Sequence, residues 1–324
     1  MTLSIIIPVY NAEDYIKESL KSVYTQNLDS FEVICVDDGS TDNSAEIIRE
    51  LQNEHSNLIL YQQENQGPSA ARNSGLKLAK GDYVFFLDND DTFIGTETLG
   101  KILSTAQNYD VDICVFNALI NGEKPFLHPF PSSKKAISGP ELMDLFYKTC
   151  NSLIIPIWCH LYRKSFLIKH KLQFDERFLV EDILFTPPTQ YCASKALCQD
   201  INLVNYRWQR PGAITSSRST RYLIDRRNTG RELFDWFTSN NAQENAPYQF
   251  IFSVYTEVIQ SISDTKLRTN TILHRTDYAI MQQCVRTPRD RKCYRLARIN
   301  PKLMVRYIEN TLPPIIRKAI NRFL

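Results

Sequence analysis

The chain has 324 residues and a formal net charge of +2, and 43% of its residues are hydrophobic, so it can bury the cores of about two domains. Its N-terminal apolar run is far too short for a signal peptide, and no uncharged apolar stretch reaches the roughly 20 residues of a membrane-spanning helix, so we expect neither secretion nor membrane spanning. The eight cysteines include no CxxC pair, which argues against a zinc site and favours free thiols in a reducing cytoplasm.

The first 120 residues alternate short β-rich runs with helical patterns, which is typical of βαβ units around a mostly parallel sheet. The predicted strands are Leu3–Val9, Phe31–Val36, Leu58–Gln62, Tyr83–Leu87 and Ile113–Phe116. Of the helices between them, one is expected to be capped by Asn11, a second to follow Asp42 and a third to follow Pro68. Because ligands bind at the carboxyl ends of the strands in such sheets, we expect the functional residues just after each strand.

Acidic loops follow two of these strands. The run Asp88-Asn89-Asp90-Asp91 closes a buried strand, and its carboxylates suit Mg2+ or Mn2+; a metal that also takes diphosphate oxygens needs only one or two of them. The loop Asp37-Asp38-Gly39 follows the second strand, where a carboxylate can bind a nucleobase or a ribose. A helix-capping turn and an Asx-turn are the alternative interpretations of the two loops.

Further downstream, Pro187-Pro188 is expected to end the apolar pattern that runs from Trp158 to Phe185. A charged pair, Glu181-Asp182, lies within that pattern. No glycine-rich phosphate loop, GxGxxG or GxxxxGK[ST], is present, which argues against nicotinamide dehydrogenases and P-loop enzymes.

Four motifs lie in order along the chain: Ser4–Asn11, Val36–Asp42, Asn65–Gly75 and Gly81–Asp91. In type and spacing they resemble glycosyltransferase family 2, the inverting enzymes with the GT-A fold. The resemblance covers about residues 1–120 and continues more weakly to Tyr206-Arg207, in a form similar to bacterial polysaccharide-assembly members. It implies a Rossmann-like α/β fold, with a mostly parallel central sheet and flanking helices, followed by a helical C-terminal region.

The resemblance also implies nucleotide-binding roles. Pro8 and Tyr10 look like the pair that packs around the base, and Asp38 looks like the hydrogen-bond partner of the base. Arg72 resembles the basic residue near the donor, and Asp88 the residue that contacts the ribose. Tyr10 could instead be a core aromatic, and Arg72 could form a salt bridge on a helix surface.

The resemblance assigns metal binding and catalysis to four acidic residues. Asp90 resembles the direct ligand of Mn2+ or Mg2+, and Asp91 is an alternative ligand. Glu181-Asp182 resembles the family's ED motif, in which Asp182 is the base that deprotonates the acceptor hydroxyl. The alternative is a helix start with favourable acidic charge. His160 stands where relatives often carry lysine, and there it is either structural or a contact to phosphate or acceptor.

These observations predict a GT-A domain at residues 1–214, with a nucleotide-binding half at about 1–120 and an acceptor-binding half at about 121–214, followed by a basic helical region at 215–324. The implied activity is metal-dependent transfer of a hexosyl or N-acetylhexosaminyl group from a nucleotide-diphosphate sugar, a UDP-sugar, to a hydroxyl of a glycan or lipid-linked glycan in cell-surface polysaccharide synthesis. A sugar nucleotidyltransferase and a non-catalytic nucleotide-sugar-binding subunit are the alternatives.

The C-terminal region is strongly basic. Residues 266–324 carry 14 Lys or Arg against three acidic residues, a balance of +11. The segment 312–324 places apolar side chains on one helical face and Arg317, Lys318 and Arg322 on the other, as in a helix that lies in a membrane interface. We therefore expect an anionic surface on the inner face of the cell membrane as a partner, and no nucleic acid. A core-packing helix is the alternative for this segment.

Overall fold

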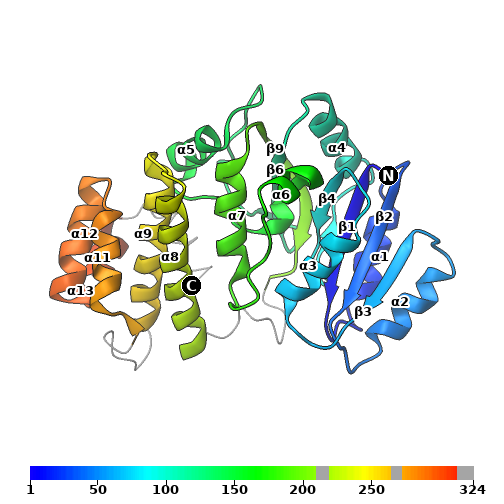
Figure 1. Ribbon diagram of the computed structural model, residues 1–324, viewed down its shortest axis with the longest axis horizontal. Coiled ribbons are helices and arrows are strands. Elements are labelled where there is room, and N and C mark those ends of the chain that lie inside the picture. Colours follow the sequence, from blue (N-terminus) through cyan, green and yellow to red (C-terminus); the bar gives the residue numbers. More distant parts are fainter. Residues whose placement is uncertain (209–218, 264–271, 312–324) are drawn as a thin grey trace. The chain divides into compact units, whose positions relative to one another are not determined.

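The computed structural model describes residues 1–208, 219–263 and 272–311, and the chain divides into two compact units. The first unit comprises Met1–Arg177 and Glu181–Pro211, and the second comprises Phe178–Val180 and Gly212–Leu324. A β-sheet with flanking helices forms the first unit, and helices form the described part of the second (Figure 1).

The sheet of the first unit has nine strands within the described residues, in the order β3-β2-β1-β4-β8-β6-β9-β5, with β7 beside β6. The strands are β1 (Leu3–Val9), β2 (Phe31–Asp37), β3 (Leu58–Gln62), β4 (Tyr83–Phe86), β5 (Thr92–Phe93), β6 (Ile113–Ile120), β7 (Lys124–Pro125), β8 (His160–Arg163) and β9 (Ala196–Tyr206). The longest pairings, β1 with β2 and β6 with β9, are parallel, whereas β8 is antiparallel to both of its neighbours. The predicted α/β fold with a mostly parallel sheet is confirmed.

The helices of this unit are α1 (Ile16–Tyr24), α2 (Ser44–Gln52), α3 (Pro68–Leu78), α4 (Thr98–Asn108), α5 (Gly139–Cys150), α6 (Lys164–Lys169) and α7 (Glu181–Cys192), together with the 3-10 turn η1 (Ile157–Cys159). Helix α3 packs on β1 and β2. Gly75 allows this packing, because a Cβ there would lie 2.4 Å from Cγ2 of Ile6. The close approach brings Arg72, one turn earlier on α3, to the sheet.

The predicted helix cap at Asn11 was wrong. Helix α1 begins at Ile16 with no side-chain cap, and Asn11 lies outside it with a left-handed φ of 48°. The Oδ1 atom of Asn11 instead accepts a hydrogen bond from the amide of Thr41 at 2.8 Å. Asn tolerates the left-handed conformation, so the residue serves a turn between the first two strand-end loops rather than a helix.

The prediction that Pro187-Pro188 ends the apolar pattern was also wrong, because α7 continues through both prolines to Cys192. Two prolines deprive the helix of two backbone donors, which ordinarily breaks it. Tertiary contacts compensate here. All residues of α7 from Phe185 to Gln190 are buried, and Thr186 and Gln190 donate side-chain hydrogen bonds to the carbonyls of Ile155 and Ile154 at 2.6 and 2.7 Å.

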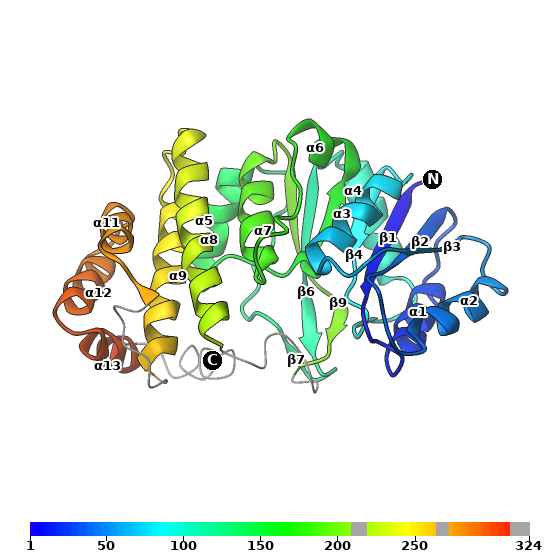
Figure 2. The ribbon, with the colours of Figure 1, turned by 60° about the horizontal axis from the view of Figure 1, so that its bottom comes forward.

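The second unit contains α8 (Thr220–Ser239), α9 (Asn245–Ser263), α11 (Arg275–Gln283), α12 (Pro288–Ile299) and α13 (Pro301–Thr311). Helices α8 and α9 lie side by side (Figures 1 and 2), and the core of the unit includes Phe237 and Tyr255. The predicted helical C-terminal region is thus confirmed, while the segment 312–324 lies outside the described residues. No described helix is both long and apolar enough to span a bilayer.

Candidate active site

Strands β1, β2 and β4 run parallel, so their carboxyl ends and the loops that follow them meet at one edge of the sheet. Pro8 is buried near the end of β1, and its carbonyl accepts a hydrogen bond from Nδ2 of Asn89 at 2.8 Å. Tyr10 follows β1 and is 47% exposed. The loop after β1 is thus tied to the acidic loop after β4 and presents an aromatic ring to solvent.

Asp38 holds the loop that precedes α3. It is 3% exposed; its Oδ1 accepts hydrogen bonds from the side chain of Gln63 at 2.8 Å and the amide of Gln66 at 2.9 Å, and its Oδ2 accepts one from the amide of Gly67 at 2.7 Å. Because carboxylate oxygens can each accept about two hydrogen bonds, Oδ2 has capacity for one more donor. The sequence motif contains this aspartate but does not reveal its role in ordering the loop.

Arg72 of α3 connects the loop after β4 with the start of α7. Its guanidinium is 5% exposed, and it donates from Nη2 to Oδ1 of Asp88 at 2.7 Å and from Nη1 to Oε1 of Glu181 at 2.5 Å. It also lies over the ring of Phe174, with Cζ 5.6 Å from the ring centroid. Burial alone would lower the pKa of Arg72, but the charges of Asp88, Glu181 and Asp182 raise it, so the guanidinium stays charged. The alternative of a surface salt bridge is therefore wrong.

Glu181 and Asp182 start α7 but have different surroundings. Glu181 is 8% exposed and accepts the hydrogen bond from Arg72. Oδ1 of Asp182 is buried and has no hydrogen-bond partner among the described residues. Burial, followed by the charge of Glu181, raises the pKa of Asp182 well above its usual value, although Arg72 opposes the shift. Such a carboxylate binds a proton more readily than an exposed aspartate does, as a general base must.

The acidic loop after β4 crowds three carboxylates together. Asp90 is partly exposed, whereas Asp91 is fully buried, and burial together with the charges of Asp88 and Asp90 raises the pKa of Asp91 well above its usual value. Oδ2 of Asp91 has no hydrogen-bond partner in the part of the chain that the structure describes. Oxygen donors alone suit a hard dication such as Mg2+ or Mn2+. No group of three or more His, Cys, Asp or Glu side chains positioned to hold a metal occurs among the described residues.

Arg207 fixes this acidic loop, and no role was predicted for it. The amide of Arg207 donates to Oδ1 of Asp91 at 2.8 Å, and its Nε donates to the carbonyl of Asp90 at 3.0 Å. Its guanidinium also pairs with Glu18 at 2.7 Å and lies over the ring of Tyr15. The signal in the sequence was Tyr206-Arg207, the pair at which the weaker family resemblance ends.

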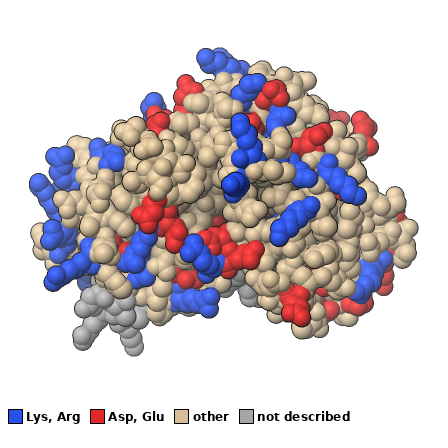
Figure 3. Space-filling model, in the orientation of Figure 1, with Lys and Arg blue, Asp and Glu red and all other residues tan. Residues whose placement is uncertain are grey.

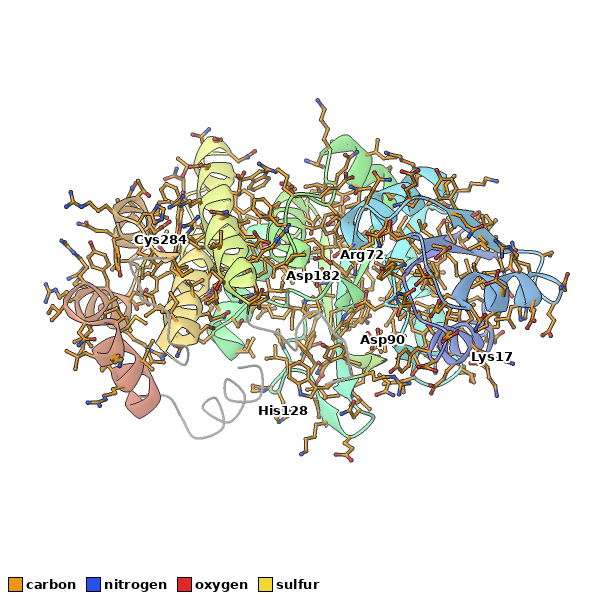
Figure 4. All side chains as sticks on the ribbon, turned by 90° about the horizontal axis from the view of Figure 1, so that it is seen from below. Lys17, Arg72, Asp90, His128, Asp182 and Cys284 are labelled. Carbon is orange, nitrogen blue, oxygen red and sulfur yellow. The ribbon has the colours of Figure 1, made fainter. Side chains whose placement is uncertain are left out.

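Cys159 lies in η1, directly before His160 of β8. It is fully buried; burial raises the pKa of its thiol, and the charges of Asp91 and Asp182 raise it further. Figure 4 shows Arg72, Asp90 and Asp182 in the same part of the first unit. The structure therefore brings the predicted nucleotide, metal and catalytic residues together around one site.

His160 has a structural role. It is fully buried; Nδ1 lies 3.0 Å from the carbonyl oxygen of Pro156, and Nε2 lies 2.9 Å from Nε2 of Gln190. Burial lowers the pKa of His160 to about 3, so the ring is neutral, with Nδ1 donating to Pro156 and Nε2 accepting from Gln190. A buried neutral imidazole with both nitrogens engaged does not bind phosphate in this state.

Curated relatives match up to about two thirds of the chain. The uncharacterized glycosyltransferase EpsJ of Bacillus subtilis is 31% identical over 218 residues, which cover 66% of this chain and 62% of the relative. The poly(ribitol-phosphate) beta-glucosyltransferase of Bacillus spizizenii is 40% identical over 192 residues, which cover 57% of this chain and 29% of the relative. The chain thus spans less than two thirds of the length of either relative.

Solved structures share the fold over nearly the whole chain. TarS of S. aureus, solved in complex with UDP, matches with a TM-score of 0.65 at 21% identity over 96% of this chain and 92% of the solved chain. The model of glycosyl transferase family 2 matches residues 4–171, more than half of the chain. The acidic loops and the Arg72 network lie within or next to that span, and the chain belongs to glycosyl transferase family 2.

Proposed function

We propose that the protein is an inverting glycosyltransferase that transfers a sugar from a UDP-sugar to a hydroxyl of a glycan or lipid-linked glycan in cell-surface polysaccharide synthesis. The observation that carries the proposal is the contrast within one pair of carboxylates. Glu181 is held by Arg72, whereas Oδ1 of Asp182 is buried without a partner among the described residues and its pKa is raised. One carboxylate is structural, and the other is able to accept a proton.

The donor is proposed to bind at the carboxyl ends of β1, β2 and β4. The exposed ring of Tyr10, next to Pro8, would stack on the base, and the remaining acceptor capacity of Asp38 would bind the base imide. Asp88 would accept a hydrogen bond from the ribose while Arg72 keeps it in place. The structure of TarS with UDP-GlcNAc supports a UDP-sugar as donor, because the folds correspond.

In the proposed reaction, Asp182 removes the proton from the acceptor hydroxyl as the hydroxyl oxygen attacks the anomeric carbon. A new carbon–oxygen bond forms on one face of the sugar, and the bond to the nucleoside diphosphate breaks on the opposite face. The electron pair leaves with the diphosphate, and the proton stays on the carboxyl of Asp182. General-base assistance of this kind contributes about 10²- to 10⁴-fold in rate.

Asp90 is proposed to hold Mn2+ or Mg2+, with Asp91 as the alternative ligand. The partial exposure of Asp90 favours it, since Asp91 is enclosed and bonded to the amide of Arg207. A bound dication would neutralise the diphosphate and the crowded carboxylates of this loop. A mannosyltransferase of Pyrobaculum calidifontis with a similar fold was solved with GDP-Man and Mn2+ (TM-score 0.52), which supports a metal.

The proposed acceptor and location follow the relatives. The poly(ribitol-phosphate) beta-glucosyltransferase acts, by its name, on poly(ribitol-phosphate). We propose a hexosyl or N-acetylhexosaminyl transfer to a polymer of this kind on the cytoplasmic side of the membrane. We propose residues 1–214 as the catalytic domain, with nucleotide-binding and acceptor-binding halves. The proposed helix at 312–324 on the inner face of the membrane rests on its sequence pattern.

The test measures which leaving group the protein releases. The whole chain is incubated with UDP-, GDP- and dTDP-sugars in the presence of Mn2+, with water or added glycans as acceptors. Release of a nucleoside diphosphate, slowed about 10²- to 10⁴-fold by Asp182→Asn, is the expected result. Release of pyrophosphate from a nucleoside triphosphate and a sugar phosphate would instead identify a nucleotidyltransferase. Donor binding without turnover for any acceptor would identify a binding subunit.

A further inference from the structure

The last helices of the second unit carry a basic surface. Besides Lys292, five basic side chains of α12 and α13 are exposed: Arg291, Arg295, Arg298, Lys302 and Arg306. On the face shown in Figure 3, Lys and Arg side chains gather over the helices α11–α13, on the left of the view. This charge lies outside the residues that match the family model, and the proposed transfer reaction does not use it.

The acidic side chains described in this part of the chain do not neutralise that surface. Asp277 is fully buried, and its two oxygens accept hydrogen bonds from Nε and Nη2 of Arg231 at 2.5 and 2.8 Å. Asp290 accepts hydrogen bonds from the amides of Thr287 and Arg286 at 2.9 and 3.2 Å, as part of the cap of α12. Both acids are committed to internal contacts.

Within the described part of the chain, these five exposed side chains have no acidic partner. Two other cations of this region lie over aromatic rings: Arg286 over Tyr248, at 4.2 Å from the ring centroid, and Lys292 over Tyr307, at 4.4 Å. None of the five exposed cations forms an ion pair within the described residues. Their charges are therefore available to an external anion.

Two exposed apolar side chains lie at the turn between α12 and α13. Ile299, the last residue of α12, is 75% exposed, and Leu303, in the first turn of α13, is 40% exposed. Asn300 makes this turn rigid, because its amide donates to the carbonyl of Leu296 at 2.8 Å and its Oδ1 accepts from the amide of Lys302 at 3.0 Å. The turn thus holds apolar side chains at the centre of a basic segment.

We infer that this basic corner, residues 295–306, docks on a bilayer surface that contains anionic lipids. Arg295, Arg298 and Lys302 would contact the lipid phosphates, while Ile299 and Leu303 would insert between the headgroups. The apolar pair favours lipid over nucleic acid, because only the bilayer offers an apolar phase to bury these side chains. The inference rests on described residues and is independent of the segment 312–324 and of the proposed transfer reaction.

The test is co-sedimentation of the full chain with vesicles of phosphatidylcholine, with and without phosphatidylglycerol. Binding is expected only with phosphatidylglycerol and should weaken as salt is raised. Each basic residue near the surface contributes about fivefold in partitioning, so the triple variant Arg295→Gln, Arg298→Gln, Lys302→Gln should bind about 100-fold more weakly. The double variant Ile299→Ser, Leu303→Ser should also bind more weakly and keep its dependence on salt.

The matched control removes three exposed lysines of the first unit: Lys17→Gln, Lys21→Gln, Lys77→Gln. It has the same change in net charge and should bind vesicles as the unaltered protein does. Equal loss in both triple variants would overturn the inference, as would unchanged binding of the corner variants. Tighter binding to duplex DNA than to vesicles, without any effect of the Ile299 and Leu303 changes, would assign the surface to nucleic acid. Calorimetric UDP binding should be unchanged in all variants, which separates this test from that of the donor site.

Discussion

The guanidinium of Arg72 lies 2.5 Å from the carboxylate of Glu181, which is 109 positions further along the chain. The same guanidinium contacts Asp88 at 2.7 Å, so one buried cation ties α3, the loop after β4 and the start of α7 together. The neighbouring Asp182 is left with a buried oxygen that has no hydrogen-bond partner within the described residues. The two adjacent carboxylates therefore differ: Glu181 forms an ion pair, and Asp182 keeps a buried oxygen that could accept a proton.

Asp182→Asn tests the proposed base. The substitution keeps the size of the side chain and removes the proton acceptor, so sugar transfer should fall by about 10²- to 10⁴-fold while the affinity for UDP stays near that of the unaltered protein. Rates are measured by UDP release and affinity by calorimetry. Transfer at the original rate with an identified acceptor would end the assignment.

Arg72→Met tests the buried ion-pair network. Because the change leaves Asp88 and Glu181 without their cation at a site where Arg72 is 5% exposed, we expect a loss of about 3–5 kcal/mol in the free energy of unfolding of the first unit. The matched control is Arg177→Met, whose guanidinium pairs with Asp175 at 2.6 Å but is 63% exposed, and it should cost less than about 1 kcal/mol. Equal losses in urea denaturation would contradict a special role for Arg72.

The pH dependence of transfer should report Asp182. Burial and the charge of Glu181 raise the pKa of Asp182, whereas Arg72 lowers it, so the base loses activity as pH falls through a value well above 3.8. Glu181→Gln should move the acidic limb of the kcat/KM profile to lower pH, and Arg72→Gln should move it to higher pH. Shifts in the same direction would show that another group controls the limb.

The same pKa shift predicts a change in stability with pH. A carboxyl group whose pKa is raised by folding stabilises the native state below its ordinary pKa, and that contribution is lost as pH rises through the raised value. Asp182→Asn removes the buried charge. The melting temperature of this variant minus that of the unaltered protein should therefore increase as pH rises from 4 through the raised pKa of Asp182. Calorimetric melting at a series of pH values measures the difference; a constant difference would mean that Asp182 ionises as freely in the folded chain as in the unfolded one.

Metal dependence tests the acidic loop. UDP should bind weakly in EDTA and tightly with Mn2+, because the carboxylates of Asp88, Asp90 and Asp91 repel a diphosphate that carries no metal. Asp90→Asn should remove most of the effect of Mn2+. Asp112→Asn, at a carboxylate that accepts hydrogen bonds from Ser194, is the control and should leave it unchanged. Equal UDP affinity with EDTA and with Mn2+ would refute the metal site.

Much of the fold followed from local pattern. The predicted strands Leu3–Val9 and Leu58–Gln62 have the observed bounds, and α3, predicted to follow Pro68, begins at Pro68 itself. Buried strands and helix starts leave signals within a few residues, in apolar runs, capping side chains and prolines. The predictions failed where a contact with a residue distant in sequence outweighed the local sequence signal. Two prolines lie inside α7 because the helix is buried from Phe185 to Gln190, and Asn11 serves a turn because Thr41 provides the donor.

By itself, the sequence determined the family, the α/β class and the acidic residues at the strand ends, because these depend on residue type and spacing along the chain. Only the tertiary structure decided which carboxylate of Glu181-Asp182 is paired, that Asp38 orders the loop at Gln66 and Gly67, and that Arg207 fixes Asp91. The physical reason is that ion pairing, burial and the resulting pKa shifts depend on distances between segments far apart in sequence, and packing alone sets these distances.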